Sequence, residues 1–223
     1  MYQELVLNND PKSIISETIR TLRTNLQFAS VDKKIKTILI TSSVPGEGKS
    51  FIAANLACAF AQSGSRVLLV DCDIRKGRQH YIFNSHNKSG LSNLLLENVK
   101  EKYMDYIQET KIKNLSVMFR GVTPPNPSEL LGSSKNKELI EILRNEYDIV
   151  IFDSAPINGG LTDSIIMSTL VDGVVVVSSY KETPINLLNN TKKSLQNVNA
   201  NILGVVLNRA SSKSKKYYGH YYG

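Results

Sequence analysis

The segment that most constrains the fold is a glycine-containing loop that follows an apolar run and precedes a helical pattern. Residues 37–41 read TILIT, residues 42–50 read SSVPGEGKS, and FIAANL follows. This order predicts a buried strand, a phosphate-binding loop and a helix whose N-terminus faces the phosphates. Lys49 is expected to reach the β- and γ-phosphates, and the Ser50 hydroxyl is expected to bind Mg²⁺. The chain is therefore predicted to bind a nucleoside triphosphate.

One position departs from the usual G-x-x-x-x-G-K-[ST] pattern, because Ser43 stands where the first glycine is expected. The alternative is an ordinary strand–turn–helix unit with incidental glycines, but the correct context on both sides favours the phosphate loop. The loop residues expected to contact ATP are Ser43, Pro45, Gly46, Glu47, Gly48, Lys49, Ser50 and Phe51.

The composition is that of a soluble α/β domain of 223 residues, with 41% hydrophobic residues and two cysteines, Cys58 and Cys72. No apolar run approaches the roughly 20 residues that span a bilayer, and no secretory signal pattern opens the chain. A cytoplasmic protein with buried thiols is expected. The net charge of +7 could face nucleic acid, anionic lipid or an acidic protein surface, and it does not choose among them.

The first helix is expected to begin with Asp10 as N-cap and Pro11 at its first position. It is expected to continue to about Phe28, because its apolar positions follow helical spacing: Ile15, Ile19, Leu22 and Leu26.

Strands and helices then alternate, which predicts a doubly wound, mostly parallel sheet of the P-loop NTPase class, similar to MinD and ParA proteins. We expect a helical extension over 1–35, an ATP-binding domain over 36–210 and a mobile tyrosine-rich tail over 211–223. The expected strands are 36–41, 66–71, 115–119, 148–153, 173–178 and 202–208. The expected helices are 50–62, 135–146, 162–170 and 184–197, with shorter ones near 91–97 and 101–110.

Three aspartates follow predicted strands: Asp71 and Asp73 after VLLV, and Asp153 after IVIF. The carboxyl ends of parallel strands converge beside the phosphate loop, so these side chains are expected to meet there. Asp153 with Ser50 would suit Mg²⁺, and a second carboxylate would accept the proton of a hydroxyl nucleophile such as water or tyrosine. The alternative is that these residues cap helices or lie in loops.

Together these motifs resemble Walker A, Walker A′ and Walker B of the bacterial tyrosine kinases of capsular and exopolysaccharide synthesis, in the CpsD/CapB form of Gram-positive bacteria. Further segments are similar to other parts of that family. The family's ExxRxxR oligomerisation motif is matched by ETIRTLR at 17–23, and its Pro-rich loop is matched by GVTPPNPSELL at 121–131. Its last core strand is matched by GVVLNR at 204–209, and its tyrosine cluster is matched by YYGHYY at 217–222.

The resemblance implies a protein-tyrosine kinase that uses ATP and Mg²⁺, with Lys49, Asp71, Asp73 and Asp153 as catalytic residues. Asp71 would activate the tyrosine hydroxyl, and Asp73 would join Ser50 and Asp153 at the metal. Arg75 is expected to orient these carboxylates or to contact phosphate. Two residues of the last strand would be adenine contacts, Asn208 and Arg209.

The resemblance also implies a ring-like homo-oligomer formed through Glu17, Arg20 and Arg23. The alternative is that these three side chains lie on a solvated helix face and pair with one another. Autophosphorylation between subunits would fall on Tyr217, Tyr218, Tyr221 and Tyr222, and stacking on nucleic acid is the alternative for this tail. The cytoplasmic segment of a membrane adaptor would recruit the kinase to the inner face of the membrane. Other protein substrates and a cognate tyrosine phosphatase are expected, and a nucleic-acid partner is not.

The nearest rival is a MinD/ParA-like positioning ATPase. That group carries a signature lysine at the second loop position, where this chain has Val44, and its membrane-binding members end in an amphipathic helix that a tail with Gly219 and Gly223 does not form. A third possibility is a catalytically silent module that binds nucleotide to fix its assembly. The intact lysine and aspartates count against that alternative.

Overall fold

A seven-stranded sheet organises the part of the chain that the computed structural model describes, residues 4–29, 35–158, 160 and 162–210. The strand order is β3-β4-β2-β5-β1-β6-β7, and only β3 pairs in the antiparallel sense. The predicted doubly wound, mostly parallel sheet is therefore confirmed. The strands are β1 Thr37–Ser42, β2 Val67–Asp71, β3 Gln108–Glu109, β4 Leu115–Met118, β5 Ile149–Asp153, β6 Gly173–Ser179 and β7 Ile202–Asn208.

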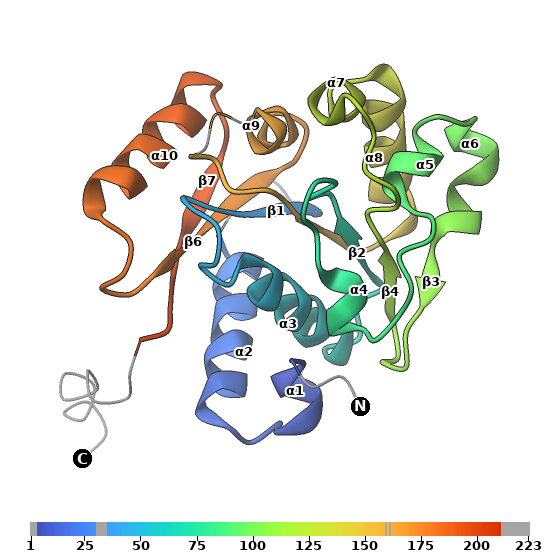
Figure 1. The fold of residues 1–223 in the computed structure, drawn as a ribbon. Helices are drawn as coiled ribbons and strands as arrows, with labels where there is room; N and C mark the ends of the chain where they lie inside the picture. The colour runs from blue at the N-terminus through green and yellow to red at the C-terminus, as the bar shows by residue number, and fades with distance from the viewer. Residues whose placement is uncertain (1–3, 30–34, 159, 161, 211–223) are drawn as a thin grey trace, which may run out of the picture.

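Helices cover both faces of the sheet (Figure 1). One face carries α1 Val6–Asn9, α2 Ile14–Gln27 and α3 Lys49–Gln62, and the other carries α8 Ser134–Glu146, α9 Asp163–Ser168 and α10 Ile185–Asn197. Across the described ranges, none of the helices combines the length and apolar character that a bilayer crossing requires. The shorter elements are α4 Gln79–Ile82, α5 Leu91–Leu94, α6 Val99–Lys102, the 3₁₀ helix η1 Tyr103–Tyr106 and α7 Pro127–Leu131.

The central strands are apolar on both sides because each supplies two cores. In β1, Ile38 and Ile40 pack toward α3, whereas Leu39 packs toward the helices of the opposite face. In β6, Val175 and Val174 divide in the same way. Successive strand side chains point to opposite faces, so a strand covered on both sides reads as a continuous apolar run.

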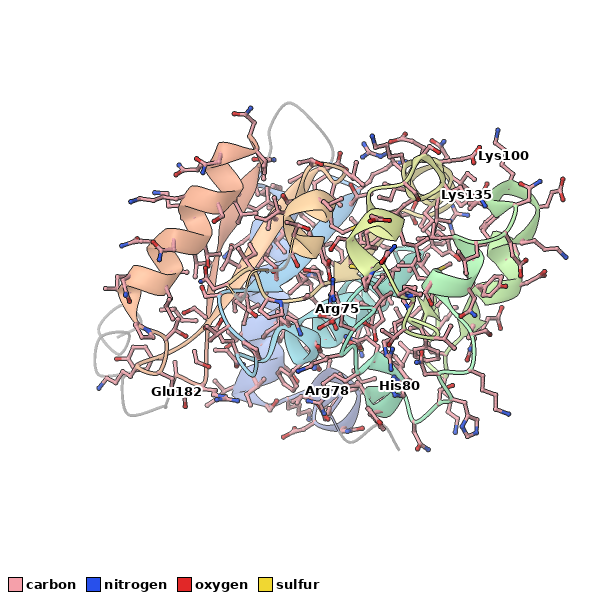
Figure 2. The ribbon with its side chains drawn as sticks, turned by 45° about the horizontal axis from the view of Figure 1, so that its top comes forward. Arg75, Arg78, His80, Lys100, Lys135 and Glu182 are labelled. Atoms are coloured by element: carbon pink, nitrogen blue, oxygen red, sulfur yellow. The ribbon has the colours of Figure 1, made fainter. Side chains whose placement is uncertain are left out.

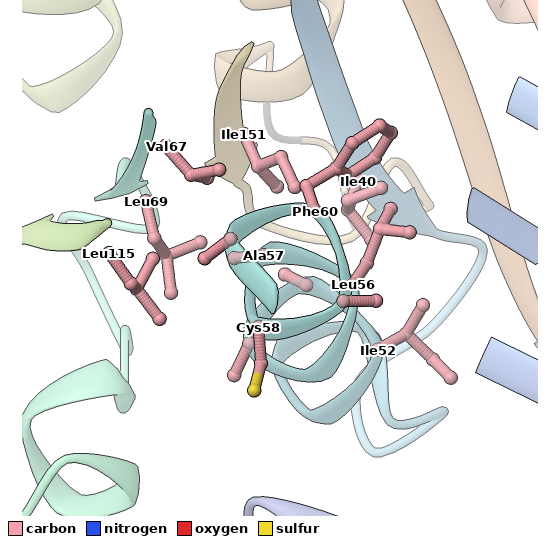
Figure 3. Close-up of a cluster of buried hydrophobic side chains, with 14 of the residues drawn as sticks. Ile40, Ile52, Leu56, Ala57, Cys58, Phe60, Val67, Leu69, Leu115 and Ile151 are labelled. Atoms are coloured by element: carbon pink, nitrogen blue, oxygen red, sulfur yellow. The ribbon is translucent and has the colours of Figure 1, made fainter. Parts of the chain in front are cut away.

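Helix α3 is the most enclosed helix of the fold, with every residue from Ile52 to Ala61 buried. Figure 3 shows Leu56 and Phe60 packed toward Ile40 and Ile151 of the sheet. The opposite side of α3 is covered by α1 and α2. A helix enclosed from both sides must be apolar all round, and its alanines let the neighbouring layers approach closely. The N-terminal extension therefore packs directly on the helix that follows the phosphate loop.

The start of α2 differs from the prediction. The helix begins at Ile14, with the Ser13 hydroxyl accepting the Ser16 N–H as the cap, while Asp10 ends α1. The carbonyl of Asp10 accepts both serine hydroxyls, which makes residues 10–13 a turn between two helices and not the first turn of one. The buried face consequently centres on Ser16, Ile19 and Leu26, and Ile15 remains 51% exposed.

The helix expected near 101–110 is wrong in its second half. The segment instead forms two short helices, α6 and η1. Gln108–Glu109 then pairs with β4 as the antiparallel edge strand β3. A two-residue strand has no periodicity of its own, so its partner determines it. Three other short helices carried too few residues for a pattern and were not predicted: α1, α4 and α7.

A half-buried carboxylate network anchors the start of β1, the strand that leads to the phosphate loop. Asp172 accepts the backbone N–H groups of Lys36 and Thr37 at 2.9 Å each, and it pairs with Arg144 at 2.8 Å. Burial alone would raise the pKa of Asp172, but these hydrogen bonds and the Arg144 charge together lower it below the ordinary value.

We expect Asp172→Asn to reduce the free energy of unfolding at pH 7 by about 2 kcal/mol, because charge-assisted hydrogen bonds are lost. A lowered carboxyl pKa stabilises the fold above the unfolded pKa, and this contribution is lost as the pH falls through the folded pKa. The difference in free energy of unfolding between wild type and variant, measured by urea titration, should therefore shrink as the pH falls toward about 3. Asp105→Asn, on the exposed side of η1, is the matched control. A gap that is independent of pH would contradict this role.

Candidate active site

The phosphate loop joins β1 to α3 through two glycines in the left-handed region, Gly46 (φ +85°) and Gly48 (φ +89°). A Cβ at Gly48 would lie 2.1 Å from the side-chain nitrogen of Asn208, so this position excludes a side chain on two grounds. Helix α3 begins at Lys49, one residue before the predicted start. Its first N–H groups are available to an anion at the loop.

Glu47 holds the loop in place from inside the protein. Its carboxylate is 2% exposed, accepts the Val44 N–H at 2.8 Å and also accepts the Ser179 N–H and the Thr183 hydroxyl. Ser43, at the position of the missing glycine, is also buried, and its hydroxyl accepts that of Thr191. Glu47 and Ser43 were both predicted to contact ATP. Because their side chains are occupied by these hydrogen bonds within the protein, only their main-chain groups are left for that role.

The end of β7 closes the other side of the loop. Asn208 donates to the Glu47 carbonyl at 2.9 Å, and Arg209 donates to the Gly46 carbonyl at 2.7 Å. Arg209 also pairs with Glu182 at 2.6 Å (Glu182 is labelled in Figure 2). A cavity of about 350 Å³ lies between these groups, lined by Gly46, Gly48, Lys49, Ser50, Phe51, Arg78, Asn208 and Arg209.

The three predicted aspartates do meet beside the loop. Asp71 ends β2 and Asp153 ends β5, and the two are direct partners in the parallel register. The N–H of Asp73 donates to the Asp153 carbonyl at 3.0 Å, and the carboxylate of Asp73 lies 3.4 Å from the Lys49 ammonium. All three carboxylates are at most 3% exposed. The site therefore concentrates buried negative charge around the ammonium group of Lys49, whose side chain is 13% exposed.

Burial and mutual repulsion set the charge states of this cluster. Burial, followed by the charge of Asp153, holds the pKa of Asp71 well above its ordinary value. Burial also raises the pKa of Asp153, although Lys49 and the hydrogen bonds from Gln79 and Ser50 oppose the rise. For Lys49, burial alone would lower the pKa, but the surrounding carboxylates, Asp153 first, raise it. Lys49 therefore stays charged, and Asp71 is a stronger proton acceptor than an exposed carboxylate.

The predicted role of Arg75 in orienting these carboxylates is wrong. Its guanidinium instead holds Asp163 of α9 at 2.7 Å and donates to the Ser128 hydroxyl of α7 at 3.3 Å (Arg75 is labelled in Figure 2). Asp163 is buried and attracts the nearest cation, so Arg75 ties the loop after β2 to the two helices above it. A contact of Arg75 with phosphate remains a prediction.

Three residues at the end of the loop after β2 and the start of α4 were missed from the sequence: Gly77, Arg78 and Gln79. A Cβ at Gly77 would lie 2.1 Å from a carboxylate oxygen of Asp71, so the close approach of this loop needs glycine. Arg78, labelled in Figure 2, lines the cavity and pairs with Glu4 at 2.5 Å. Gln79 donates to Asp153 at 2.8 Å. Their position a few residues beyond a strand-end aspartate was the available signal.

The expected oligomerisation motif lies on α2, and its arginine side chains make contacts within the same chain. Arg20 pairs with Glu17 at 2.5 Å, and Arg23 donates to the Ala59 carbonyl of α3 at 3.4 Å. A fully solvated helix face, the alternative for this motif, is therefore wrong for Arg23, which lies against α3. A role for these residues between subunits remains a prediction. The predicted tail tyrosines, Tyr217, Tyr218, Tyr221 and Tyr222, lie outside the described residues.

Comparisons with known proteins agree on one family. A family model described as an AAA domain matches residues 35–204. YwqD of Bacillus subtilis, a tyrosine-protein kinase, is 41% identical over 221 residues, which are 99% of this chain and 92% of YwqD. CapB of Staphylococcus aureus, which is named as a tyrosine-protein kinase by assignment, is 40% identical over 98% of this chain and 95% of CapB. The chain belongs to the bacterial tyrosine-protein kinases.

Solved structures place this kinase in the same family. The chimerical protein CapA2B2 is similar with a TM-score of 0.88 and 43% identity, over 94% of this chain and 91% of that one. The cell-division ATPase MinD of Pyrococcus furiosus has a TM-score of 0.63 at 25% identity, over 77% of this chain and 71% of that one. The kinase and MinD therefore share the P-loop fold, as predicted, while the full-length relatives decide for the kinase and against the positioning ATPase.

We expect Lys49→Met to lower self-phosphorylation from radioactive ATP by about 100-fold or more, because a charge aimed at the transferring phosphate is lost. The fold should be retained, since methionine has similar length and apolar bulk. Circular dichroism and thermal melting check the fold. Lys137→Met, on the exposed side of α8, is the control. Wild-type labelling by a folded Lys49→Met protein would remove Lys49 from the mechanism.

Proposed function

We propose that this kinase transfers the γ-phosphoryl group of ATP to tyrosines of its own tail, mainly between subunits, as part of the control of capsular or exopolysaccharide synthesis. The observation that carries the proposal is the convergence of Lys49, Asp71, Asp73 and Asp153 beside a cavity that the end of β7 borders. The tail begins directly after that strand, and four of its last seven residues are tyrosines.

The described side chains account for each part of an in-line transfer. Lys49 and the N–H groups of the loop would hold the β- and γ-phosphates. The tyrosine oxygen attacks the γ-phosphorus, and the bond from that phosphorus to the β–γ bridging oxygen breaks, so ADP leaves. Asp71 accepts the tyrosine proton, a task for which its raised pKa suits it.

The residues present fit a bound Mg²⁺ ion. Asp153 and Asp71 each keep one buried oxygen, Oδ1, that receives no hydrogen bond in the described structure. Hard oxygen donors are what Mg²⁺ prefers, and the ion uses few protein ligands together with phosphate oxygens. We assign Ser50 and Asp153 to the ion, with Asp73 assisting. No group of three or more His, Cys, Asp or Glu among the described residues could hold a metal alone. When bound, Mg²⁺ would neutralise charge on the β- and γ-oxygens.

Partners follow from the same family. We propose a cytoplasmic segment of a membrane adaptor as activator, which would bring the kinase to the inner face of the membrane. Support comes from the similar chimerical protein CapA2B2, which by its name joins two components. Other protein substrates and a cognate tyrosine phosphatase belong to the same proposal, and nucleic acid does not.

Transfer between subunits can be tested with two complementary variants. One is active but lacks acceptors, because Tyr217, Tyr218, Tyr221 and Tyr222 are all changed to Phe. The other is Lys49→Met with its tail intact. Mixing them with ATP and Mg²⁺ should place phosphate on the tail of the Lys49→Met protein, as read by mass spectrometry of tail peptides. Lys49→Met incubated alone is the control. If wild type labels its tail while the mixture does not, transfer occurs within one subunit.

For the homo-oligomer, we propose α2 as a contact surface. Its exposed apolar side chains support this, because Ile14 is 60% exposed and Phe28 is 78% exposed. Arg20→Ala should reduce the assembly to monomers in light scattering. The loss of its pair with Glu17 should cost the fold only about 0.5 kcal/mol. Lys12→Ala, just before α2, is the matched control. An unchanged assembly in the Arg20 variant would refute the interface.

A further inference from the structure

A buried glutamine connects all three motifs of the active site. Gln79 is 0% exposed, and its side-chain nitrogen donates to the Asp153 carboxylate at 2.8 Å and to the Ser50 carbonyl at 3.1 Å. Its backbone N–H donates to the Asp71 carboxylate at 3.0 Å. One residue thus contacts the phosphate-loop helix and the aspartates that end β2 and β5.

The orientation of the Gln79 amide is determined by its partners. The Ser50 carbonyl and the Asp153 carboxylate are both acceptors, so the NH₂ group must face them. The amide oxygen is consequently left buried with no donor in the described structure. A buried acceptor without a donor reduces stability, and an apolar side chain of the same length would avoid that cost. Packing alone therefore gives no reason for a glutamine here.

The contacts of Gln79 select which carboxylate oxygens remain free. Gln79 occupies Oδ2 of Asp153 through its side chain and Oδ2 of Asp71 through its backbone, and Oδ1 of each aspartate is the oxygen without a donor. Gly77, two residues before Gln79, packs so closely on Asp71 that a Cβ there would lie 2.1 Å from Oδ1 of that carboxylate. We propose that Gln79 is a positioning residue that holds Asp153 with Oδ1 presented to the metal-bound nucleotide. This inference rests on the proposed assignment of Asp153 and Ser50 to Mg²⁺.

The test is the gain in nucleotide affinity that Mg²⁺ supplies. Binding of a slowly hydrolysed fluorescent ATP analogue is measured with Mg²⁺ and with EDTA, for wild type, Gln79→Met and the exposed control Gln196→Met on α10. We expect Gln79→Met to reduce this gain by about tenfold or more, as is typical when a residue that orients a metal ligand is lost. Affinity in EDTA should stay within about twofold of wild type, because the loop itself is intact.

Kinetics provide an independent readout. The Mg²⁺ concentration for half-maximal tail phosphorylation should rise in Gln79→Met and stay unchanged in Gln196→Met. Gln79→Asn, which keeps the amide but shortens its reach, should show the same change if distance to Asp153 matters. This second variant also keeps the proposal testable if Gln79→Met melts far below wild type.

The outcomes separate the inference from the function on which it rests. If wild type shows no Mg²⁺-dependent gain in affinity, the metal assignment itself fails. If wild type shows the gain and folded Gln79→Met and Gln79→Asn keep it, the positioning role alone is overturned. An equal loss of affinity with Mg²⁺ and with EDTA also overturns it, since Gln79 would then support the phosphate loop through Ser50 only.

Discussion

The charge balance between the Lys49 ammonium and three buried carboxylates is the constraint on which the site depends. Removing Asp71, Asp73 and Asp153 from water is costly, and Lys49 compensates only one of the three charges they would carry. Burial first, and the repulsion of the neighbouring carboxylates after it, raise the pKa values of Asp71 and Asp153. A cluster of this kind is poised to receive further positive charge, which is what a nucleotide-bound cation brings. Apolar cores on both faces of the sheet keep these groups out of water.

The parallel register brings these charges together. Because β2 and β5 are neighbours in the sheet, their last residues, Asp71 and Asp153, end side by side, and β1 delivers the phosphate loop to the same edge. The network of Asp172 at the opposite end of β1 anchors that strand, while Ser179 of β6 and Asn208 of β7 both donate to Glu47 in its loop. The loop is thus supported by segments more than 130 residues away in sequence.

The end of β7 contacts the phosphate loop close to the point where the tyrosine-rich segment begins in the sequence. Arg209, the last charged residue before position 211, donates to the loop carbonyl of Gly46 and lines the cavity beside the phosphate loop. The end of β7 is therefore part of the lining of the cavity where we propose that the nucleotide binds. At the other end of the chain, α1 and α2 pack on α3, whose first turn carries Lys49 and Ser50. The proposed oligomerisation helix and the end of β7 therefore both contact the elements that we propose to bind phosphate.

Local patterns in the sequence determined the motifs, the long strands and helices, and the kinase family, because each rests on residues close together in the chain. Boundaries of the long elements were predicted to within a few residues, since apolar runs and glycine turns mark them. The tertiary structure alone decided the partners of long polar side chains. Arg75 reaches Asp163, Arg23 lies on α3, and Gln79 links Ser50 to Asp153, all across distances that no sequence spacing encodes. A side chain pairs with whichever charge the fold brings near it, and only the packed chain determines that proximity.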